Sequence, residues 1–253
     1  MPDVLVSFVV PAYNEEALIA SCLASIQAEI ARIGCPAEII VVDNNSTDGT
    51  RRIASSVAGV MVVDEPQQGL VQARRAGCLA ASGRLIANID ADTILPEGWL
   101  RTALAEFSHS PDLVALSGPC IYYDLPRSAR LVAAVFYRIA FATYLFVRFV
   151  LGAGSMIQGG NFIISKRALE AAGGFNSDFR FYGEDTELAR RLSKVGPVKF
   201  SLRLPAYSSG RRFVAEGLIR AGLRYAVNYV WTILFKQPFT VTWSDFRHPR
   251  GVQ

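Results

Sequence analysis

The sequence predicts an α/β fold in which helices flank a mostly parallel central sheet. Short apolar runs, typical of buried strands, alternate along the chain with longer segments that have a helical pattern. This regular alternation is typical of βαβ units, whose strands pair in parallel. Several of the apolar runs end in polar residues, and in such sheets ligands bind beyond the carboxyl ends of the strands. We therefore expect the functional residues to gather at one edge of the sheet.

The first half of the chain supplies four expected strands and three expected helices. We expect strands at 4–10, 38–42, 60–63 and 85–89. We expect helices at 15–34 and at 70–81, and between them a helix that follows Ser46 or Thr47 and ends near 58. Glu15 and Glu16 place negative charge in the first turn of the first helix, where the helix dipole favours it. Ser46 or Thr47 can cap the second helix.

The second half continues the pattern with longer helices. We expect helices at 96–107 and 127–151, strands at 113–118, after 158 and at 197–202, a helix beginning near 184, and a last helix that reaches 235. Charged residues step by four along this last helix and predict a charged face on it: Arg212, Glu216, Arg220 and Arg224.

The composition is that of a well-packed globular protein. Its 253 residues are 51% hydrophobic and 19% charged, and the net charge of +4 suits an anionic small molecule or membrane surface as well as nucleic acid. Only two histidines are present, which excludes a His-rich metal site. Four cysteines without a CxxC pair predict free thiols in a reducing compartment. Since no signal peptide is evident, we expect a cytoplasmic protein.

Two carboxylates follow the apolar run at 85–89. Asp90 and Asp92 are one residue apart, so in an extended chain their side chains point to the same side. Their hard oxygen atoms suit Mg²⁺ or Mn²⁺, which can bridge phosphates. Alternatively, both residues only cap the turn that leads to the helix near Pro96. The motif is too short to decide between these interpretations by itself.

Three segments resemble the nucleotide-binding half of the family 2 glycosyltransferases, which have the GT-A fold. They are Val-Val-Pro-Ala-Tyr-Asn-Glu at 9–15, Ile-Ile-Val-Val-Asp-Asn-Asn-Ser-Thr-Asp-Gly-Thr at 39–50, and Ile-Asp-Ala-Asp at 89–92. Segments 158–166 and 181–192 resemble the acceptor half. The resemblance covers most of residues 4–200. It implies one GT-A domain over 1–253, with a nucleotide-sugar-binding half at 1–118 and an acceptor-binding lobe with amphipathic helices at 119–253.

The resemblance also implies roles for individual residues. Asp43 should hold the base or ribose of the donor, Asp90 should contact the ribose or a metal ion, and Asp92 should hold the Mn²⁺ or Mg²⁺ that bridges the donor diphosphate. The nucleotide would be UDP, GDP or dTDP. Further substrate-binding residues are expected at Pro11, Ala12, Tyr13, Glu15, Asn45, Ala91, Gly160 and Asn161.

In the acceptor half, Asp185 is the candidate general base. It lies in the first turn of a predicted helix, where the dipole favours the ionised carboxylate that can accept a hydroxyl proton. Glu184 would support the acceptor or the local turn. The alternative for Asp185 is an acidic residue favoured only by the dipole. Arg211 and Arg212 follow a glycine turn and can meet a diphosphate. Many relatives carry a histidine or a tryptophan-containing motif in this region; this sequence has no histidine there, so the third protein ligand of the metal is not identified.

The segment 127–151 is long, apolar and aromatic, yet it carries a basic stripe. Four arginines share one arc of roughly 80° around the expected helix: Arg127, Arg130, Arg138 and Arg148. This pattern is typical of an amphipathic helix at a membrane interface, whereas central arginines disfavour a transmembrane span. The alternative is a helix packed on the protein with its arginines in water.

Together these observations predict a metal-dependent, inverting glycosyltransferase, with inversion implied by the resemblance. It would move a sugar from a nucleotide-diphosphate sugar to a hydroxyl of a glycan or lipid-linked acceptor. We expect no nucleic-acid partner, and the basic stripe suits peripheral contact with the inner face of the membrane. Two alternatives remain. A polyprenyl-phosphate glycosyltransferase would need no base, and a non-catalytic nucleotide-sugar-binding module would be expected to lack the Asp-x-Asp or Glu-Asp pair.

Overall fold

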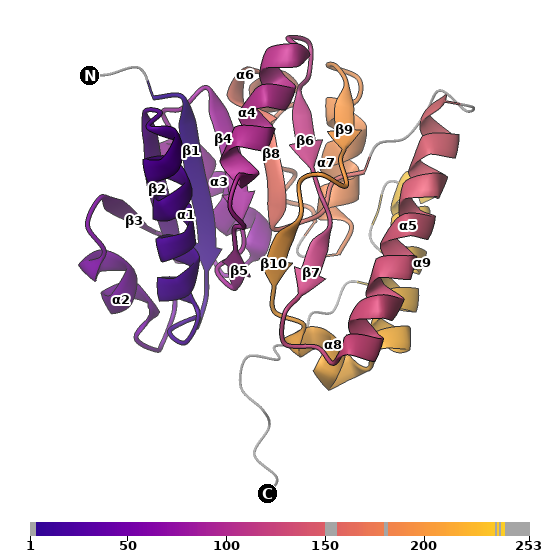
Figure 1. Cartoon of the computed structure of the whole chain (residues 1–253), viewed down its shortest axis with the longest axis horizontal. Coiled ribbons are helices and arrows are strands. Elements are labelled where there is room, and N and C mark those ends of the chain that lie inside the picture. The colour runs from indigo at the N-terminus through magenta and orange to yellow at the C-terminus, as the bar shows by residue number, and fades with distance from the viewer. Residues whose placement is uncertain (1–3, 150–155, 180–181, 236, 238, 241–253) are drawn as a thin grey trace, which may run out of the picture.

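The computed structural model describes residues 4–149, 156–179, 182–235, 237 and 239–240 (Figure 1). Within these residues the strands are β1 (Val6–Ala12), β2 (Ala37–Asp43), β3 (Val60–Asp64), β4 (Leu85–Ile89), β5 (Thr93–Ile94), β6 (Ala115–Ser117), β7 (Cys120–Tyr122), β8 (Asn161–Ser165), β9 (Val198–Phe200) and β10 (Ala206–Ser208). The helices are α1 (Ile19–Ile33), α2 (Thr50–Ser56), α3 (Leu70–Ala80), α4 (Trp99–His109), α5 (Arg127–Phe149), α6 (Lys166–Ala171), α7 (Glu184–Leu192), α8 (Arg211–Glu216) and α9 (Leu218–Phe235).

A seven-stranded sheet forms the centre of the described part of the molecule. Its strand order is β3-β2-β1-β4-β8-β6-β9, and every pairing is parallel except the two that β8 makes with β4 and β6. The predicted α/β class with a mostly parallel sheet is therefore confirmed. The structure adds a second, three-stranded sheet in the order β5-β10-β7, which the sequence analysis did not predict.

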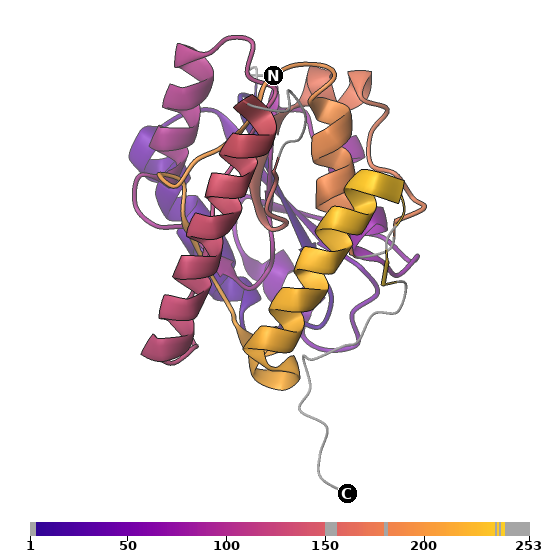
Figure 2. The ribbon, with the colours of Figure 1, turned by 90° about the vertical axis from the view of Figure 1, so that its right-hand side faces the viewer.

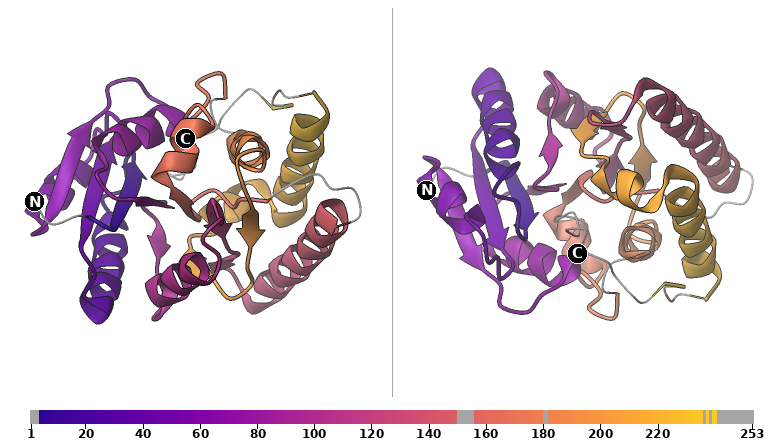
Figure 3. Two further views of the ribbon diagram at one scale, coloured as in Figure 1. Left: turned by 90° about the horizontal axis from the view of Figure 1, so that it is seen from above. Right: turned by 90° about the horizontal axis from the view of Figure 1, so that it is seen from below.

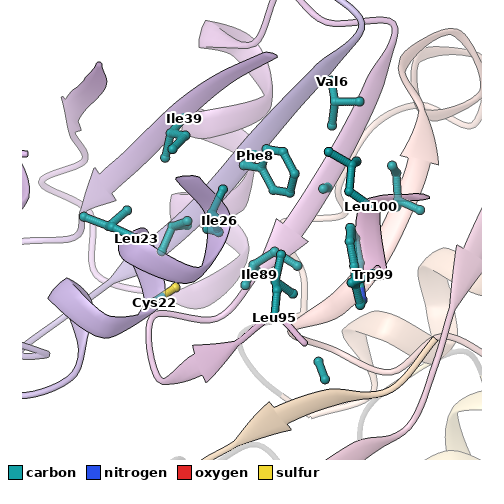
Figure 4. Close-up of a cluster of buried hydrophobic side chains, with 14 of the residues drawn as sticks. Val6, Phe8, Cys22, Leu23, Ile26, Ile39, Ile89, Leu95, Trp99 and Leu100 are labelled. Carbon is teal, nitrogen blue, oxygen red and sulfur yellow. The ribbon is translucent and has the colours of Figure 1, made fainter. Parts of the chain in front are cut away.

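Alternating side chains of the central strands fill two separate cores. On β1, Phe8 faces α1 and α4, while Val9 faces α3 on the opposite side of the sheet. This follows from the two-residue repeat of a strand. Figure 4 shows the first core, in which Phe8 lies among side chains of β2, β4, α1 and α4. A sheet covered on both faces leaves its strand ends as the open edge where a ligand can enter.

Two predicted helix starts are wrong. Helix α1 begins at Ile19 and has no acidic residue in its first turn. Glu15 lies before it, with its backbone amide donating to Thr50 Oγ1 at 2.7 Å. Helix α2 begins at Thr50 after Gly49, so neither predicted cap is used. Ser46 and Thr47 instead bond to Asn14, which ties the turn after β2 to the turn after β1.

The predicted last helix is divided in two at Gly217, whose φ of 84° lies in the left-handed region. The expected charged face survives only in part. Glu216 Oε1, at the end of α8, accepts a hydrogen bond from Arg224 of α9 at 3.1 Å, and Glu216 lies 3.8 Å from Arg212. Arg220 is exposed.

Helices α5 and α9 lie together on one side of the molecule, outside the C-terminal half (Figures 2 and 3). Buried side chains attach α5 along a narrow seam that includes Tyr137 and Tyr144, which pack with Cys120 of β7 and Phe200 of β9. The predicted end of this helix at 150–151 lies outside the described residues, as does the side chain of Arg148. In the described part of the chain, no helix is both long and apolar enough to cross a membrane.

Candidate active site

A cavity of about 210 Å³ opens at the carboxyl ends of β1 and β4. Predicted site residues in its lining are Pro11, Glu15, Asp90, Ala91, Asp92, Glu184, Asp185, Arg211 and Arg212. These residues come from both halves of the chain. The fold therefore brings the Asp-x-Asp segment, the Glu-Asp pair and the arginine pair to one cavity.

Arg74 of α3 links the Asp-x-Asp segment to the Glu-Asp pair. Its side chain is fully buried, and it donates to Glu184 Oε1 and, at 3.2 Å, to Asp90 Oδ1. One guanidinium thus neutralises a carboxylate from each half of the chain, which is a geometry that its fork of donors permits. Arg74 also lies over the ring of Phe162, with 5.5 Å from Cζ to the ring centroid.

Arg211 makes a second link on the other side of the cavity. Its guanidinium donates to both carboxylate oxygens of Glu15, at 2.9 Å to Oε2, and its Nη2 lies 3.1 Å from Asp92 Oδ2. Ser208 Oγ donates to Asp92 Oδ1 at 3.4 Å. The predicted metal ligand Asp92 is therefore held by groups from β10 and α8.

Asp185 combines access to the cavity with fixed orientation. The amide of Thr186 donates to its Oδ1 at 2.7 Å and the amide of Gly159 to its Oδ2 at 3.3 Å. Burial raises the pKa of Asp185, although these backbone hydrogen bonds and the charge of Arg74 oppose the rise. The sequence argument expected only the stabilising effect of the helix end. A raised pKa makes this carboxylate a stronger base whenever it is ionised.

Glu184 has a different environment although it is the adjacent residue. Burial raises its pKa to about 7, while the charge of Arg74 lowers it and the charges of Asp185 and Asp90 raise it further. Among the described residues no group donates a hydrogen bond to its buried Oε2. Glu184 is engaged by Arg74 inside the protein, so Asp185 is the better placed of the pair to meet an acceptor.

Other predicted substrate residues do not line this cavity: Ala12, Tyr13, Asp43, Asn45, Gly160 and Asn161. Asp43 is buried at the end of β2, and its Oδ1 accepts the amide of Ser46 at 3.4 Å. Asn45 has a left-handed backbone with φ 65° in the turn that follows. The roles of these residues at the base and ribose stay predictions.

Gly160 and Asn161 have clear structural tasks. Gly160 has φ +79°, and a Cβ there would lie 2.2 Å from Asp90 Oδ2, so glycine is what lets Asp90 occupy its position. Asn161 is fully buried; its amide donates to the carbonyls of Pro119 and Leu204, and its Oδ1 accepts Trp99 Nε1 at 2.9 Å. Its side chain therefore joins β8 to the core rather than facing the cavity.

Several lining residues were missed by the sequence analysis: Leu70, Arg74, Cys120, Tyr122, Gln158, Gly159, Tyr182, Gly183, Ser208, Ser209, Phe213 and Tyr225. A signal for Arg74 was present, because it follows the buried Val71 by three residues and shares the apolar face of its helix. Tyr182 accepts hydrogen bonds from Arg212 and Arg224, both at 3.1 Å, and no sequence pattern pointed to this contact.

The donor set suits a hard divalent cation that takes further ligands from a substrate. Asp90 and Asp92 present carboxylate oxygens to the same cavity. In the part of the chain that the structure describes, no group of three His, Cys, Asp or Glu side chains could hold a metal ion. Mg²⁺ commonly binds through one or two carboxylates together with phosphates and water, so the two aspartates fit such an ion when a diphosphate is present.

Comparisons with known proteins agree with this geometry. An uncharacterized glycosyltransferase of Mycobacterium tuberculosis, Rv0539, is 40% identical over 109 residues, which is 43% of this chain and 46% of that protein. The chain thus matches less than half the length of this curated relative. The family profile described as Glycosyl transferase family 2 matches residues 7–173.

Solved structures of low sequence identity share the fold. The mannosyltransferase PcManGT of Pyrobaculum calidifontis, solved with GDP-Man and Mn²⁺, has a TM-score of 0.63 at 23% identity, covering 88% of this chain and 64% of that one. Glucosyl-3-phosphoglycerate synthase of M. tuberculosis, solved with Mg²⁺ and UDP, has a TM-score of 0.62 at 21% identity, covering 91% and 78%. The chain has the GT-A fold of these enzymes. Because the family profile spans well over half of the chain, the chain belongs to glycosyl transferase family 2.

Proposed function

We propose that this glycosyltransferase moves a sugar from a nucleotide-diphosphate sugar to a hydroxyl group with inversion at the anomeric carbon. The observation that supports this most is that the candidate base Asp185 lines the same cavity as Asp90 and Asp92. The acceptor oxygen attacks the anomeric carbon, its proton passes to Asp185, and the bond from that carbon to the diphosphate breaks. The nucleoside diphosphate then leaves with the electrons of this bond.

The residues of the cavity divide this work between the two ends of the reacting bond. Hydrogen bonds from Thr186 and Gly159 keep Asp185 oriented, so a proton acceptor is fixed on the acceptor side. A Mg²⁺ or Mn²⁺ ion held by Asp92, with Asp90 beside it, would neutralise the charge that develops on the leaving diphosphate. Arg211 lies against Asp92 and adds positive charge on the same side.

Donor, acceptor and location follow as parts of the same proposal. The donor carries UDP, GDP or dTDP, in keeping with the GDP-Man and UDP in the two solved structures. The acceptor is a glycan or lipid-linked hydroxyl. All four cysteines are free, which favours a reducing compartment such as the cytoplasm. Transfer to a polyprenyl phosphate is the second candidate, because exposed apolar helices adjoin the cavity and such an acceptor is already anionic.

The experiment is the variant Asp185→Asn, compared by transfer rate and by calorimetry of donor binding. The active donor is first found by incubating the protein with a panel of nucleotide sugars, with and without Mn²⁺. We expect donor affinity to be retained and transfer to fall by about 10²–10⁴-fold, the usual contribution of a positioned base. Asp178→Asn, at an exposed position outside the cavity, is the matched control.

Two results would contradict the role of Asp185. Loss of donor affinity would make it a nucleotide-site or structural residue. An unchanged transfer rate would remove the need for a base and favour the polyprenyl-phosphate acceptor.

A further inference from the structure

Helix α5 carries a wide apolar face that points away from the protein. Ala133, Tyr137 and Tyr144 are buried, and at about 100° per residue they share one narrow arc. The apolar side chains on the opposite part of the helix are exposed: Leu131 (68%), Ile139 (62%), Val132 (52%), Val135 (48%) and Phe136 (44%). They span an arc of about 140°, so this is a continuous face rather than scattered surface residues.

Among the side chains of helix α9 that the structure describes, some polar ones are buried and some large apolar ones are exposed. Its buried residues include the polar Asn228 and Thr232, and Asn228 accepts the amides of Phe239 and Thr240 at 3.1 and 2.9 Å. Leu223 and Val227, which lie on the opposite side of the helix, are exposed. A helix whose only neighbour is a protein core places apolar residues inward. The outward apolar side of α9 therefore suits a second apolar environment.

The charges of the two helices are of one sign. Neither α5 nor α9 contains an aspartate or glutamate, whereas together they contain six arginines. Arg127, Arg130 and Arg138 of α5 are exposed; Arg127 and Arg138 lie next to the apolar face, and Arg130 lies nearer the buried seam. Arginines in this position can bury their stems against acyl chains while their guanidinium groups reach phosphates. Two copies of this protein meeting through the same helices would oppose arginine to arginine, which disfavours a dimer there.

We propose that the outward faces of α5 and α9 dock on an anionic phospholipid bilayer. The four exposed arginines of these helices, Arg127, Arg130, Arg138 and Arg220, select a negatively charged surface, and the exposed aliphatic side chains enter the boundary between headgroups and acyl chains. Docking does not depend on the proposed transfer reaction, because neither face takes part in it.

Helix α9 forms part of the cavity wall, and α5 contacts a residue of that wall. Tyr137 of α5 donates to Gln158 at 3.0 Å, and Gln158 and Tyr225 of α9 line the cavity. A protein docked through these helices would hold the cavity next to the lipid headgroups. A lipid-linked acceptor could then reach Asp185 while its lipid stays in the bilayer.

The test is flotation of the whole protein with phosphatidylcholine vesicles, with and without phosphatidylglycerol, at low and high salt and without donor. We expect binding to the anionic vesicles only, weakened by salt. Arg130→Gln with Arg138→Gln should lower the partition coefficient on the order of 30-fold, at the usual contribution of an arginine near such a surface. Leu131→Gln with Ile139→Gln should lower it at least as much.

Matched controls place the same changes elsewhere. Leu79→Gln on α3 and Arg101→Gln on α4 alter exposed residues outside both helices and should leave vesicle binding unchanged. Unaltered circular dichroism and thermal unfolding would establish that the α5 variants fold.

Three results would overturn the proposal. The first is wild-type protein that stays free of anionic vesicles at low salt. The second is an apolar-face variant that binds like wild type, which would leave charge alone as the cause. The third is a wild-type dimer in light scattering that Ile139→Gln dissociates, which would make a second copy the occupant. Each of these experiments measures vesicle binding or molecular mass, not sugar transfer. A negative result would therefore not affect the proposed transfer reaction.

Discussion

Arg74 is the residue on which the charge balance of the cavity depends. It is a fully buried cation that contacts Glu184 and Asp90, and those two carboxylates come from different halves of the chain. A buried charge without its counter-ion is costly, because the protein interior replaces water poorly as a solvent for it. The next residue, Arg75, lies on the same helix but is exposed.

Arg74→Ala should therefore lower the free energy of unfolding by about 3–5 kcal/mol, the usual cost of removing one partner of a buried ion pair. Arg75→Ala should change it by no more than about 0.5 kcal/mol, as for other surface substitutions. Urea unfolding of both variants measures the difference. Equal effects at the two positions would mean that the carboxylates are stabilised mainly by other groups.

At the scale of single elements, Gly118, between β6 and β7, lies in close contact with the segment between β9 and β10. A Cβ at this position would lie 1.9 Å from the carbonyl oxygen of Leu204, which already accepts Asn161 Nδ2 at 2.9 Å. The carbonyl group of Leu204 belongs to the backbone and the side chain of Asn161 is fully buried, so neither group can easily move away. The close packing of this segment against the one that leads to β10 therefore requires a residue without a side chain at Gly118.

Gly118→Ala should destabilise the fold by roughly 1–3 kcal/mol, as overpacking does in a tight core. Gly222→Ala is the matched change in α9, where a Cβ would meet nothing within 4 Å. That substitution should stabilise by roughly 0.5–1 kcal/mol, because alanine loses less backbone entropy in a helix than glycine. Chemical denaturation measures the change in the free energy of unfolding for both variants. A change of the same sign in both would contradict the contact at Gly118.

The elements also differ in how far the sequence could predict them. Buried strands such as β4 were predictable because a short, continuous apolar run is typical of a strand that is covered on both faces of the sheet. The strands β5, β7 and β10 are two or three residues long, and their pairing joins segments that are far apart in the chain, so no local pattern marks them. The break at Gly217 was also hidden, since charges at every fourth residue continue across it.

The same limit applies to the candidate site. Acidic residues at strand ends and at a helix start could be predicted, because local geometry fixes where those positions lie. The ion-pair partners of these acidic residues could not be predicted. Glu15 and Arg211 are 196 residues apart in the sequence, so no local pattern links them. For a helical arginine such as Arg74, the residue type alone does not show whether the side chain faces water or the core.

At the scale of the whole molecule, Arg211 connects the C-terminal half of the chain to the strand ends of the N-terminal half. It contacts Asp92, the residue proposed to hold the metal ion. A guanidinium and a divalent cation repel each other at this distance, so the two compete for the same carboxylate until a diphosphate supplies more negative charge.

Arg211→Gln should therefore raise the affinity of the donor-free protein for Mn²⁺ by about tenfold or more, as removal of a nearby like charge implies. Asp92→Asn should lower the affinity. Arg212→Gln is the neighbouring control, because Arg212 contacts Tyr182 and Glu216. Calorimetric titration with Mn²⁺ measures all three, and unchanged affinity in the Arg211 variant would place the ion away from Asp92.

The ion pairs that join the two halves have a consequence for recombination between relatives. Arg74 and Asp90 are encoded in the first half and Glu184 in the second, while Glu15 in the first half pairs with Arg211 in the second. A chimera that takes its N-terminal half from one enzyme and its C-terminal half from another inherits only one partner of each ion pair that joins the halves. Domain shuffling aimed at new sugar specificity should therefore transfer these residues as matched sets, or else redesign the whole interface between the exchanged segments.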